Sequence, residues 1–197
     1  MPTVRSKRGA VHREFFGAIP FAPRVFYLTS SNEVVKSFDM VHVRYLDEEV
    51  ELWLGEAKFF TDRQKAIASA IASVSSHIQQ GFLNNEKLIL GPQVSTDIPN
   101  FEKIRDILSA EASLDVLFER AVFPIFIAAN SKAAASHKKW CDDYTAEVAN
   151  ELQDLAEQVK KSGLSSKIKI ILIYVPVASK DGLAKAFDER LKGLNPC

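Results

Sequence analysis

The chain has 197 residues, of which 47% are hydrophobic and 25% are charged, and its formal net charge is zero at pH 7. This profile predicts one soluble globular domain over residues 1–197, large enough to bury a core without disulfides or structural metal. The zero net charge excludes a global basic field, so any contact with phosphates must come from local patches.

Cysteine content and hydropathy exclude further classes of protein. Cys141 and Cys197 lie far apart and form no CxxC or Cys/His cluster, which argues against structural zinc and against a secreted disulfide scaffold. The N-terminus carries no apolar signal-peptide run, and no apolar stretch is long enough to span a membrane. We therefore expect a cytoplasmic protein with no membrane contact.

The first part of the chain predicts a short helix, three strands and a longer helix. Prolines end the first helix, and an acidic turn joins the second and third strands. The longer helix starts with capping-box spacing at Thr61 and Gln64, and its apolar residues recur at helical intervals. The short helix is expected at residues 10–19 and the three strands at 24–29, 38–45 and 50–60. The longer helix is expected from residue 61 to about Gly81.

The second part predicts a loop, followed by helices that alternate with strands. Glycine and prolines mark the loop, Pro124 indicates an edge strand or a bulge, and Ser179 is placed to cap the last helix. The loop is expected at 83–100, helices at 101–120, 141–162 and 180–192, a strand at 121–129 and a buried strand at 167–177. This order predicts an α/β fold, a mixed central sheet with flanking helices.

The two strands around the acidic turn carry the candidate chemistry. Glu56 and Lys58 are two residues apart on one strand, so their side chains point to the same face. If Tyr45 pairs with Val50 across the turn, Asp39 lies directly opposite Glu56. The sequence thus predicts two carboxylates and one ammonium group together at one end of the hairpin.

Burial supports this register. The apolar residues that share the carboxylates' face are Val41, Val43, Tyr45, Val50, Leu52 and Leu54. A shift of one residue would divide this apolar set between the two faces of the hairpin. The opposite face then carries His42 and Trp53, together with a cross-strand ion pair between Arg44 and Glu51.

Two facing carboxylates repel each other, and they lose solvation at the rim of an apolar face. A divalent cation between them would remove both penalties, and Mg²⁺ (or Mn²⁺) suits a site with one or two carboxylates, waters and substrate phosphate oxygens. Such an ion would activate water for phosphodiester hydrolysis, with Lys58 orienting or helping to deprotonate that water. The alternative from geometry alone is that Asp39, Glu56 and Lys58 form a structural ion-pair cluster.

Further charged residues are candidates for contact with a substrate. Glu14 lies in the first predicted helix and is either an exposed helix charge or a further member of the site. Two basic stretches, one with Arg8 and Arg13 and the other with Lys138 and Lys139, are candidate nucleic-acid contacts. Solvated surface is the alternative for both stretches.

These residues also resemble a known group of enzymes. Asp39, followed after sixteen residues by Glu56-Ala57-Lys58, resembles the core of PD-(D/E)xK nucleases, with Phe38 in place of the leading proline. Segments 38–43 and 52–60 resemble the HamA family, the nuclease of the Hachiman anti-phage system, which is paired with the helicase HamB; the related AbpA is paired with AbpB. The resemblance implies a restriction-endonuclease-like fold, DNA as substrate and a helicase partner.

The resemblance also implies roles for particular residues. Asp39 and Glu56 carry over as metal ligands, Lys58 as the catalytic lysine and Glu14 as a further site residue. The QxxxY motif of RecB-like nucleases is incomplete, because Gln64 has no tyrosine four positions later. We therefore expect a metal-dependent deoxyribonuclease that acts in bacterial defence. The alternatives are a catalytically inactive DNA- or helicase-binding subunit with the same fold, and an unrelated α/β protein.

Overall fold

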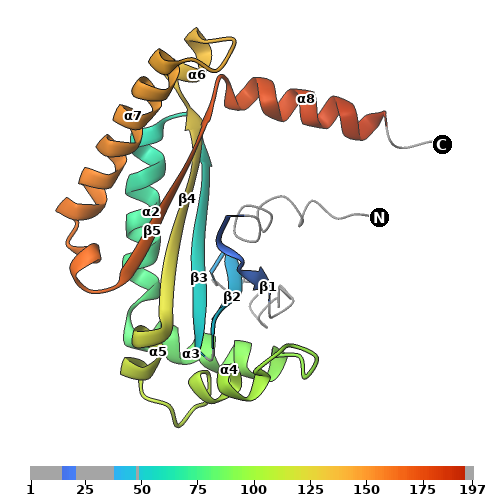
Figure 1. The fold of residues 1–197 in the computed structure, drawn as a ribbon, viewed down its shortest axis with the longest axis vertical. Coiled ribbons are helices and arrows are strands. Elements are labelled where there is room, and N and C mark those ends of the chain that lie inside the picture. Colours follow the sequence, from blue (N-terminus) through green and yellow to red (C-terminus); the bar gives the residue numbers. More distant parts are fainter. Residues whose placement is uncertain (1–14, 21–37, 48, 194–197) are drawn as a thin grey trace, which may run out of the picture. The chain divides into compact units, whose positions relative to one another are not determined.

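The structure is a computed structural model that describes residues 15–20, 38–47 and 49–193. Figure 1 labels its elements. The strands are β1 (Ile19–Pro20), β2 (Met40–Leu46), β3 (Glu49–Phe60), β4 (Ala121–Asn130) and β5 (Lys169–Val177). The helices are α2 (Arg63–His77), α3 (Gln80–Leu90), α4 (Phe101–Ile107), α5 (Leu114–Arg120), α6 (Lys132–Ser136), α7 (Asp142–Lys161) and α8 (Lys180–Lys192). Short 3₁₀ turns lie at Gly91–Gln93 and Leu164–Ser166.

The five strands form one mixed sheet in the order β1-β2-β3-β4-β5, with helices flanking it, so the predicted fold class is confirmed. β2 and β3 are antiparallel, and Tyr45 pairs with Val50 as predicted. The apolar alternation therefore did fix the register of this hairpin. At the turn, Asp47 adopts a left-handed backbone with φ of 52°, a conformation that aspartate tolerates better than most residues.

The described residues fall into two compact units. The first contains the described residues up to Glu56, then 73–124 and 168–171. The second contains 57–72, 125–167 and the remainder from Leu172. Strands β3, β4 and β5 and helix α2 contribute residues to both units. The expectation of one domain over the whole chain stays a prediction.

The first unit has a core in which both faces of the hairpin are covered. Trp53 is fully buried and packs against Ala18 and Val122, with Phe16 and Ile171 around them. Large side chains that are also fully buried here include Phe38, Leu52, Leu54, Leu83, Ile104, Leu117 and Phe123. Because a strand inside a sheet needs apolar residues on both faces when both are covered, β3 has a nearly continuous buried run.

The second unit is built on the packing of α2 and α7. Ile67 and Ala70 of α2, Ile127 of β4, and Leu155 and Val159 of α7 are all buried. Gly163 follows the end of α7 with φ of 74°, a left-handed conformation that glycine adopts readily. Ser179 caps α8 by accepting a hydrogen bond from the backbone N–H of Gly182 at 3.0 Å, which confirms the predicted cap.

Some element boundaries were predicted wrongly. Residues 83–90 belong to α3 rather than to a loop, because the breaking residues begin only at Gly91 and because Leu83 and Leu90 are both buried on one helix face. The single helix expected over 101–120 is two helices, and Ser113 starts the second by capping the backbone N–H of Val116.

Three further predictions also need correction. β4 lies inside the sheet, so the edge strand, one of the two alternatives that Pro124 suggested, is wrong. β5 is the last strand in the order and is half-buried rather than buried. Asp62, not Thr61, caps α2, since its carboxylate accepts the backbone N–H of Lys65 at 2.9 Å.

At the N-terminus, Phe15 and Phe16 are helical, but Ile19 and Pro20 form β1 rather than the end of a helix. Residues 10–14 of the predicted helix and the whole predicted strand at 24–29 lie outside the described residues. Among the helices that the structure describes, none is both long and apolar enough to cross a membrane.

Candidate functional site

The hairpin register determines where the two predicted metal ligands lie. The β2–β3 ladder ends where Met40 pairs with Gly55, and Asp39, in a bend just before β2, and Glu56 are the next residues of the two segments. Asp39 is half-buried, and Glu56 is buried with an exposed fraction of 3%. Phe38, fully buried, fixes the entry of the chain into β2. Both carboxylates belong to the first unit.

Glu56 faces a histidine that sequence reasoning did not select. The Nδ1 atom of His77 lies 2.9 Å from Oε1 of Glu56, and both side chains are almost fully buried. The imidazole stacks on Phe82 with ring centroids 4.2 Å apart, and Phe38 meets it edge-on at 5.0 Å. Two aromatic rings therefore hold the imidazole against the carboxylate, which limits the orientations open to Glu56.

A signal for His77 was present in the helical pattern. The buried positions of α2 are Ala66, Ile67, Ala70 and Val74, and His77 continues that spacing at i+3 from Val74. A polar residue on the buried stripe of a helix needs a partner, because a buried polar group without one is costly. The carboxylate of Glu56 lies 2.9 Å from Nδ1 of His77, although the angles of this contact are not those of a hydrogen bond.

Lys58 lies two residues beyond Glu56 in the uninterrupted strand β3 and is half-buried. Strand alternation places these two side chains on one face of β3 and Ala57 on the other. The third predicted acid, Glu14, lies outside the described residues.

The donor set is compatible with a hard divalent cation. In the part of the chain that the structure describes, no group of three or more His, Cys, Asp or Glu residues is arranged to hold a metal. Mg²⁺ needs fewer protein ligands than that, since one or two carboxylates are completed by waters and substrate phosphates. Asp39 and Glu56 are the two carboxylates that would serve as such ligands.

The opposite face of the hairpin carries the predicted ion pair. Nη1 of Arg44 lies 3.4 Å from Oε2 of Glu51, and Lys169 and the indole of Trp53 contact the same carboxylate. Burial is the largest influence on the pKa of Glu51 and raises it. The hydrogen bonds from Lys169 and Trp53, with the positive charges of Lys169 and Arg44, outweigh burial, so the pKa is lowered. This cluster is structural.

A second buried carboxylate organises the second unit. Glu151 accepts hydrogen bonds from the hydroxyl of Tyr174 at 2.8 Å and from the backbone N–H of Lys132 at 3.1 Å, and Nη1 of Arg63 lies 3.1 Å away. Arg63, Lys132 and Glu151 border an open pocket of about 520 Å³. The pocket's guanidinium is already paired, since Arg63 also contacts Asp154 at 3.2 Å.

The described basic patch is exposed. Lys138 and Lys139 lie in the segment between α6 and α7, and both are exposed to solvent. Trp140 follows them with an exposed fraction of 81%, beside the ring of Tyr144 at a centroid distance of 5.4 Å. An exposed tryptophan beside two lysines is the combination that stacks on bases and attracts phosphates. The other predicted patch, with Arg8 and Arg13, lies outside the described residues.

Comparison with known proteins gives one family. The family model described as HamA matches residues 10–191 of the 197-residue chain, which includes β2, β3 and the helices described above except for the last residue of α8. A search of curated proteins found no match to the chain.

Proposed function

The chain belongs to the HamA family, and from that membership we propose that it is a metal-dependent DNA endonuclease. The family implies a role in Hachiman anti-phage defence. The nuclease activity, the metal and the substrate are our proposal. The observation that supports it is the β2–β3 register, whose last pair, Met40 with Gly55, is followed by Asp39 on one segment and Glu56 on the other, with Lys58 two residues further along β3.

The proposed roles follow from the chemistry of each group. Asp39 and Glu56 hold Mg²⁺ or Mn²⁺ through carboxylate oxygens, and the bound cation supplies Lewis-acid activation of water and neutralisation of phosphate charge. Lys58 donates hydrogen bonds to the attacking water or to a phosphate oxygen, which orients the water and stabilises the developing charge. His77 holds the Glu56 carboxylate in one orientation through the 2.9 Å contact.

Contact with DNA is assigned to the basic patches. Lys138 and Lys139 attract the phosphate backbone, and the exposed ring of Trp140 offers a face on which a base stacks. Arg8 and Arg13 form the second part of the proposed DNA contact. Because the net charge of the chain is zero, these local patches have to supply most of the attraction, and binding should weaken steeply with salt.

A helicase of the HamB or AbpB kind is the proposed partner. Helix α8 has no buried residue, and its apolar side chains Leu183, Phe187 and Leu191 are 51%, 40% and 42% exposed. Their spacing of four residues places them in one stripe along the helix. An amphipathic helix with such anchors docks into an apolar groove of a partner, and we assign that groove to the helicase.

One observation favours a second candidate, a subunit that binds DNA or the helicase without cutting. The Glu56 carboxylate is 3% exposed and already contacts His77. A carboxylate with a protein partner gains less from a cation than a solvated one that must be neutralised. In this alternative the same fold delivers the helicase to DNA, and Glu56 is a structural residue.

Cleavage of supercoiled plasmid separates the two candidates. Wild-type protein is assayed with Mg²⁺, Mn²⁺ or chelator, beside Glu56→Gln and Lys58→Ala. The matched controls are Glu49→Gln and Lys65→Ala, which change the same residue types at exposed positions nearby. Metal-dependent cutting that both site variants lose and both controls keep supports the nuclease. Plasmid that stays intact with wild type and every metal favours the non-cutting subunit.

A further inference from the structure

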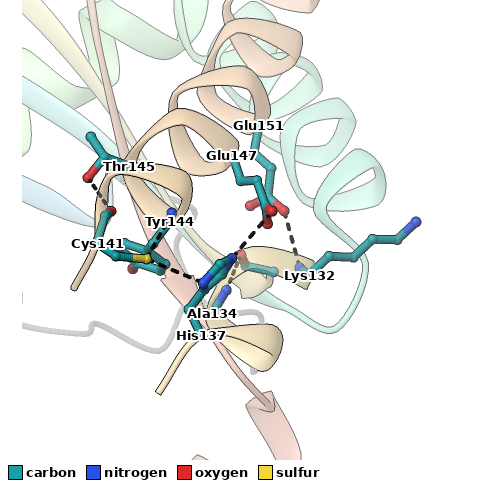
Figure 2. A network of polar contacts seen from close by, with 9 residues as sticks. Lys132, Ala134, His137, Cys141, Tyr144, Thr145, Glu147 and Glu151 are labelled. Carbon is teal, nitrogen blue, oxygen red and sulfur yellow. Dashed lines mark hydrogen bonds and ion pairs between the residues drawn. The ribbon is translucent and has the colours of Figure 1, made fainter. Parts of the chain in front are cut away.

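A cluster of three reactive side chains lies in the second unit, and the proposed nuclease site does not use it. We call Cys141, His137 and Glu147 the thiol cluster. The sulfur of Cys141 lies 3.4 Å from Nδ1 of His137, and Nε2 of the same imidazole lies 3.3 Å from Oε1 of Glu147. Figure 2 shows the imidazole between the sulfur and the carboxylate. The three side chains are thus arranged as a nucleophile (Cys141), a base (His137) and a carboxylate that orients the base (Glu147).

The backbone holds this row in place from both sides. His137 follows α6, and its N–H donates to the carbonyl of Ala133 at 3.0 Å. Cys141 caps the 20-residue helix α7, and its sulfur accepts the backbone N–H of Tyr144 at 3.5 Å. Glu147 projects from the same helix towards the imidazole (Figure 2). The geometry therefore follows from the α6–α7 junction rather than from a chance surface contact.

The arrangement does not suit a metal ion. Cys141 and Glu147 contact opposite nitrogens of one imidazole, so a single cation cannot be ligated by all three side chains. The same geometry suits proton transfer. Glu147 accepts from Nε2–H, which leaves Nδ1 as the nitrogen that takes up the proton of the Cys141 thiol. Cys141 is exposed, so a small molecule in solvent reaches its sulfur.

We propose that Cys141 is a reactive thiol that exchanges with low-molecular-weight disulfides and carries the resulting mixed disulfide. His137 takes the thiol proton, and the sulfur attacks one sulfur of the disulfide. The S–S bond of the reagent breaks as the new S–S bond to Cys141 forms. The other half of the reagent leaves as a thiolate, which the imidazolium protonates. The reagent is the oxidant, so atoms and electrons balance without a further reactant.

The reaction is measured on the full chain with Cys197→Ser, because the sequence then has Cys141 as its one remaining cysteine. The reagents are dithiodipyridine, followed by absorbance, and oxidised glutathione, followed by the mass of the adduct. At pH 7 we expect the folded protein to react at least about tenfold faster than the same chain in urea, a smaller factor than the roughly hundredfold or more that a well-positioned general base gives.

Two variants test the cluster itself. His137→Gln should slow the reaction about tenfold, and Glu147→Gln should slow it severalfold because the imidazole loses its orientation. Glu157→Gln, an exposed change further along α7, should react like the parent. Glu147 is exposed at the surface, so its variant tests the idea even where His137→Gln loses structure. A folded protein that reacts no faster than the chain in urea, or a Glu147→Gln variant that reacts like the parent, overturns the proposal.

Discussion

His77 Nδ1 lies 2.9 Å from Oε1 of Glu56, and the two side chains are 9% and 3% exposed. The imidazole belongs to the last turn of α2, and the carboxylate to the middle of β3. This contact joins the helix that follows the hairpin to the residue that we assign as a metal ligand. We therefore expect His77 to affect two properties separately, the stability of the protein and metal binding by Glu56.

Removal of the imidazole should destabilise the protein. His77→Ala leaves the buried Glu56 carboxylate without this partner and opens space beside Phe82, so we expect a loss of about 3 kcal/mol in the free energy of unfolding. Urea denaturation measures it. The double variant His77→Ala/Glu56→Gln should lose clearly less than the sum of the two single variants. Additivity within about 0.5 kcal/mol would show that the two residues do not interact.

Metal binding should raise the melting temperature of the wild type. A cation that binds only the folded state stabilises that state by about 2.7 kcal/mol when the free cation concentration is a hundred times the dissociation constant. We expect Mn²⁺ to shift the melting temperature of wild type and of the exposed control Asp97→Asn, and to leave Asp39→Asn and Glu56→Gln unmoved. An equal shift in all four proteins would place the metal elsewhere.

The sequence predicted the hairpin well because its pattern is overdetermined. A shift of one residue would move the apolar residues of one strand to the other face, and the observed register also pairs Arg44 with Glu51, whose Nη1 and Oε2 atoms lie 3.4 Å apart. The prediction that Asp39 lies opposite Glu56 extends this register by one residue beyond the pair of Met40 with Gly55. Long-range partners do not follow in this way. His77 meets Glu56 through the path of α2, which no local pattern specifies.

Other wrong predictions also arise because contacts between distant segments cannot be read from local sequence. β5 is a continuous apolar run, which reads as a buried central strand, yet its place at the end of the sheet leaves it half-buried. Conversely, Pro124 indicated an edge strand or a bulge, and the position of β4 between two neighbouring strands excludes the edge. Strand order depends on contacts between distant segments, so composition predicts that a strand exists more reliably than where it lies.

Helix α8 should be required for the helicase partner and dispensable for the fold. Leu183→Asp and Phe187→Asp replace exposed apolar side chains, so we expect the melting temperature to change little. Co-elution with the helicase on size exclusion should be lost, since a charge at a buried interface anchor is costly. Lys185→Ala, on the same helix, is the control. Undiminished co-elution of both aspartate variants would exclude this stripe as the interface.

Gly55 should be intolerant of a side chain. A methyl group at this position would lie 2.9 Å from Cε of Met40 and 3.2 Å from the backbone carbonyl of Pro124. Met40 can move, but the carbonyl belongs to β4 and cannot move without displacing the strand. We expect Gly55→Ala to cost about 2 kcal/mol of unfolding free energy by denaturation. Gly81→Ala, where nothing lies within 4 Å, should cost nothing measurable by comparison.

The pairing of Tyr174 with Glu151 should make stability depend on pH in two windows. Burial is the largest influence on the pKa of Tyr174 and raises it. The hydrogen bond to Glu151 and the negative charge of Glu151 raise it further, to about 12. Burial is also the largest influence on Glu151 and raises its pKa, but the hydrogen bonds from Tyr174 and Ser131 and the charge of Arg63 outweigh it. The pKa of Glu151 is therefore lowered from its ordinary 4.5.

Tyr174→Phe tests this coupling through the free energy of unfolding between pH 3 and pH 12. A lowered carboxyl pKa gives stability that is present above pH 4.5 and is lost as the pH falls through the folded value. A raised phenol pKa gives stability that is present below pH 10 and is lost as the pH rises towards 12. The cost of Tyr174→Phe should therefore be about 2 kcal/mol at pH 7 and shrink at both extremes.

A second tyrosine supplies the control for that measurement. The hydroxyl of Tyr45 donates to the carbonyl of Pro99 at 2.8 Å, and this acceptor does not titrate. The cost of Tyr45→Phe should therefore stay constant from pH 7 down to pH 3, whereas the cost of Tyr174→Phe falls over the same range. If the two costs fall in parallel, the acid sensitivity comes from global charge rather than from Glu151, and the coupling is refuted.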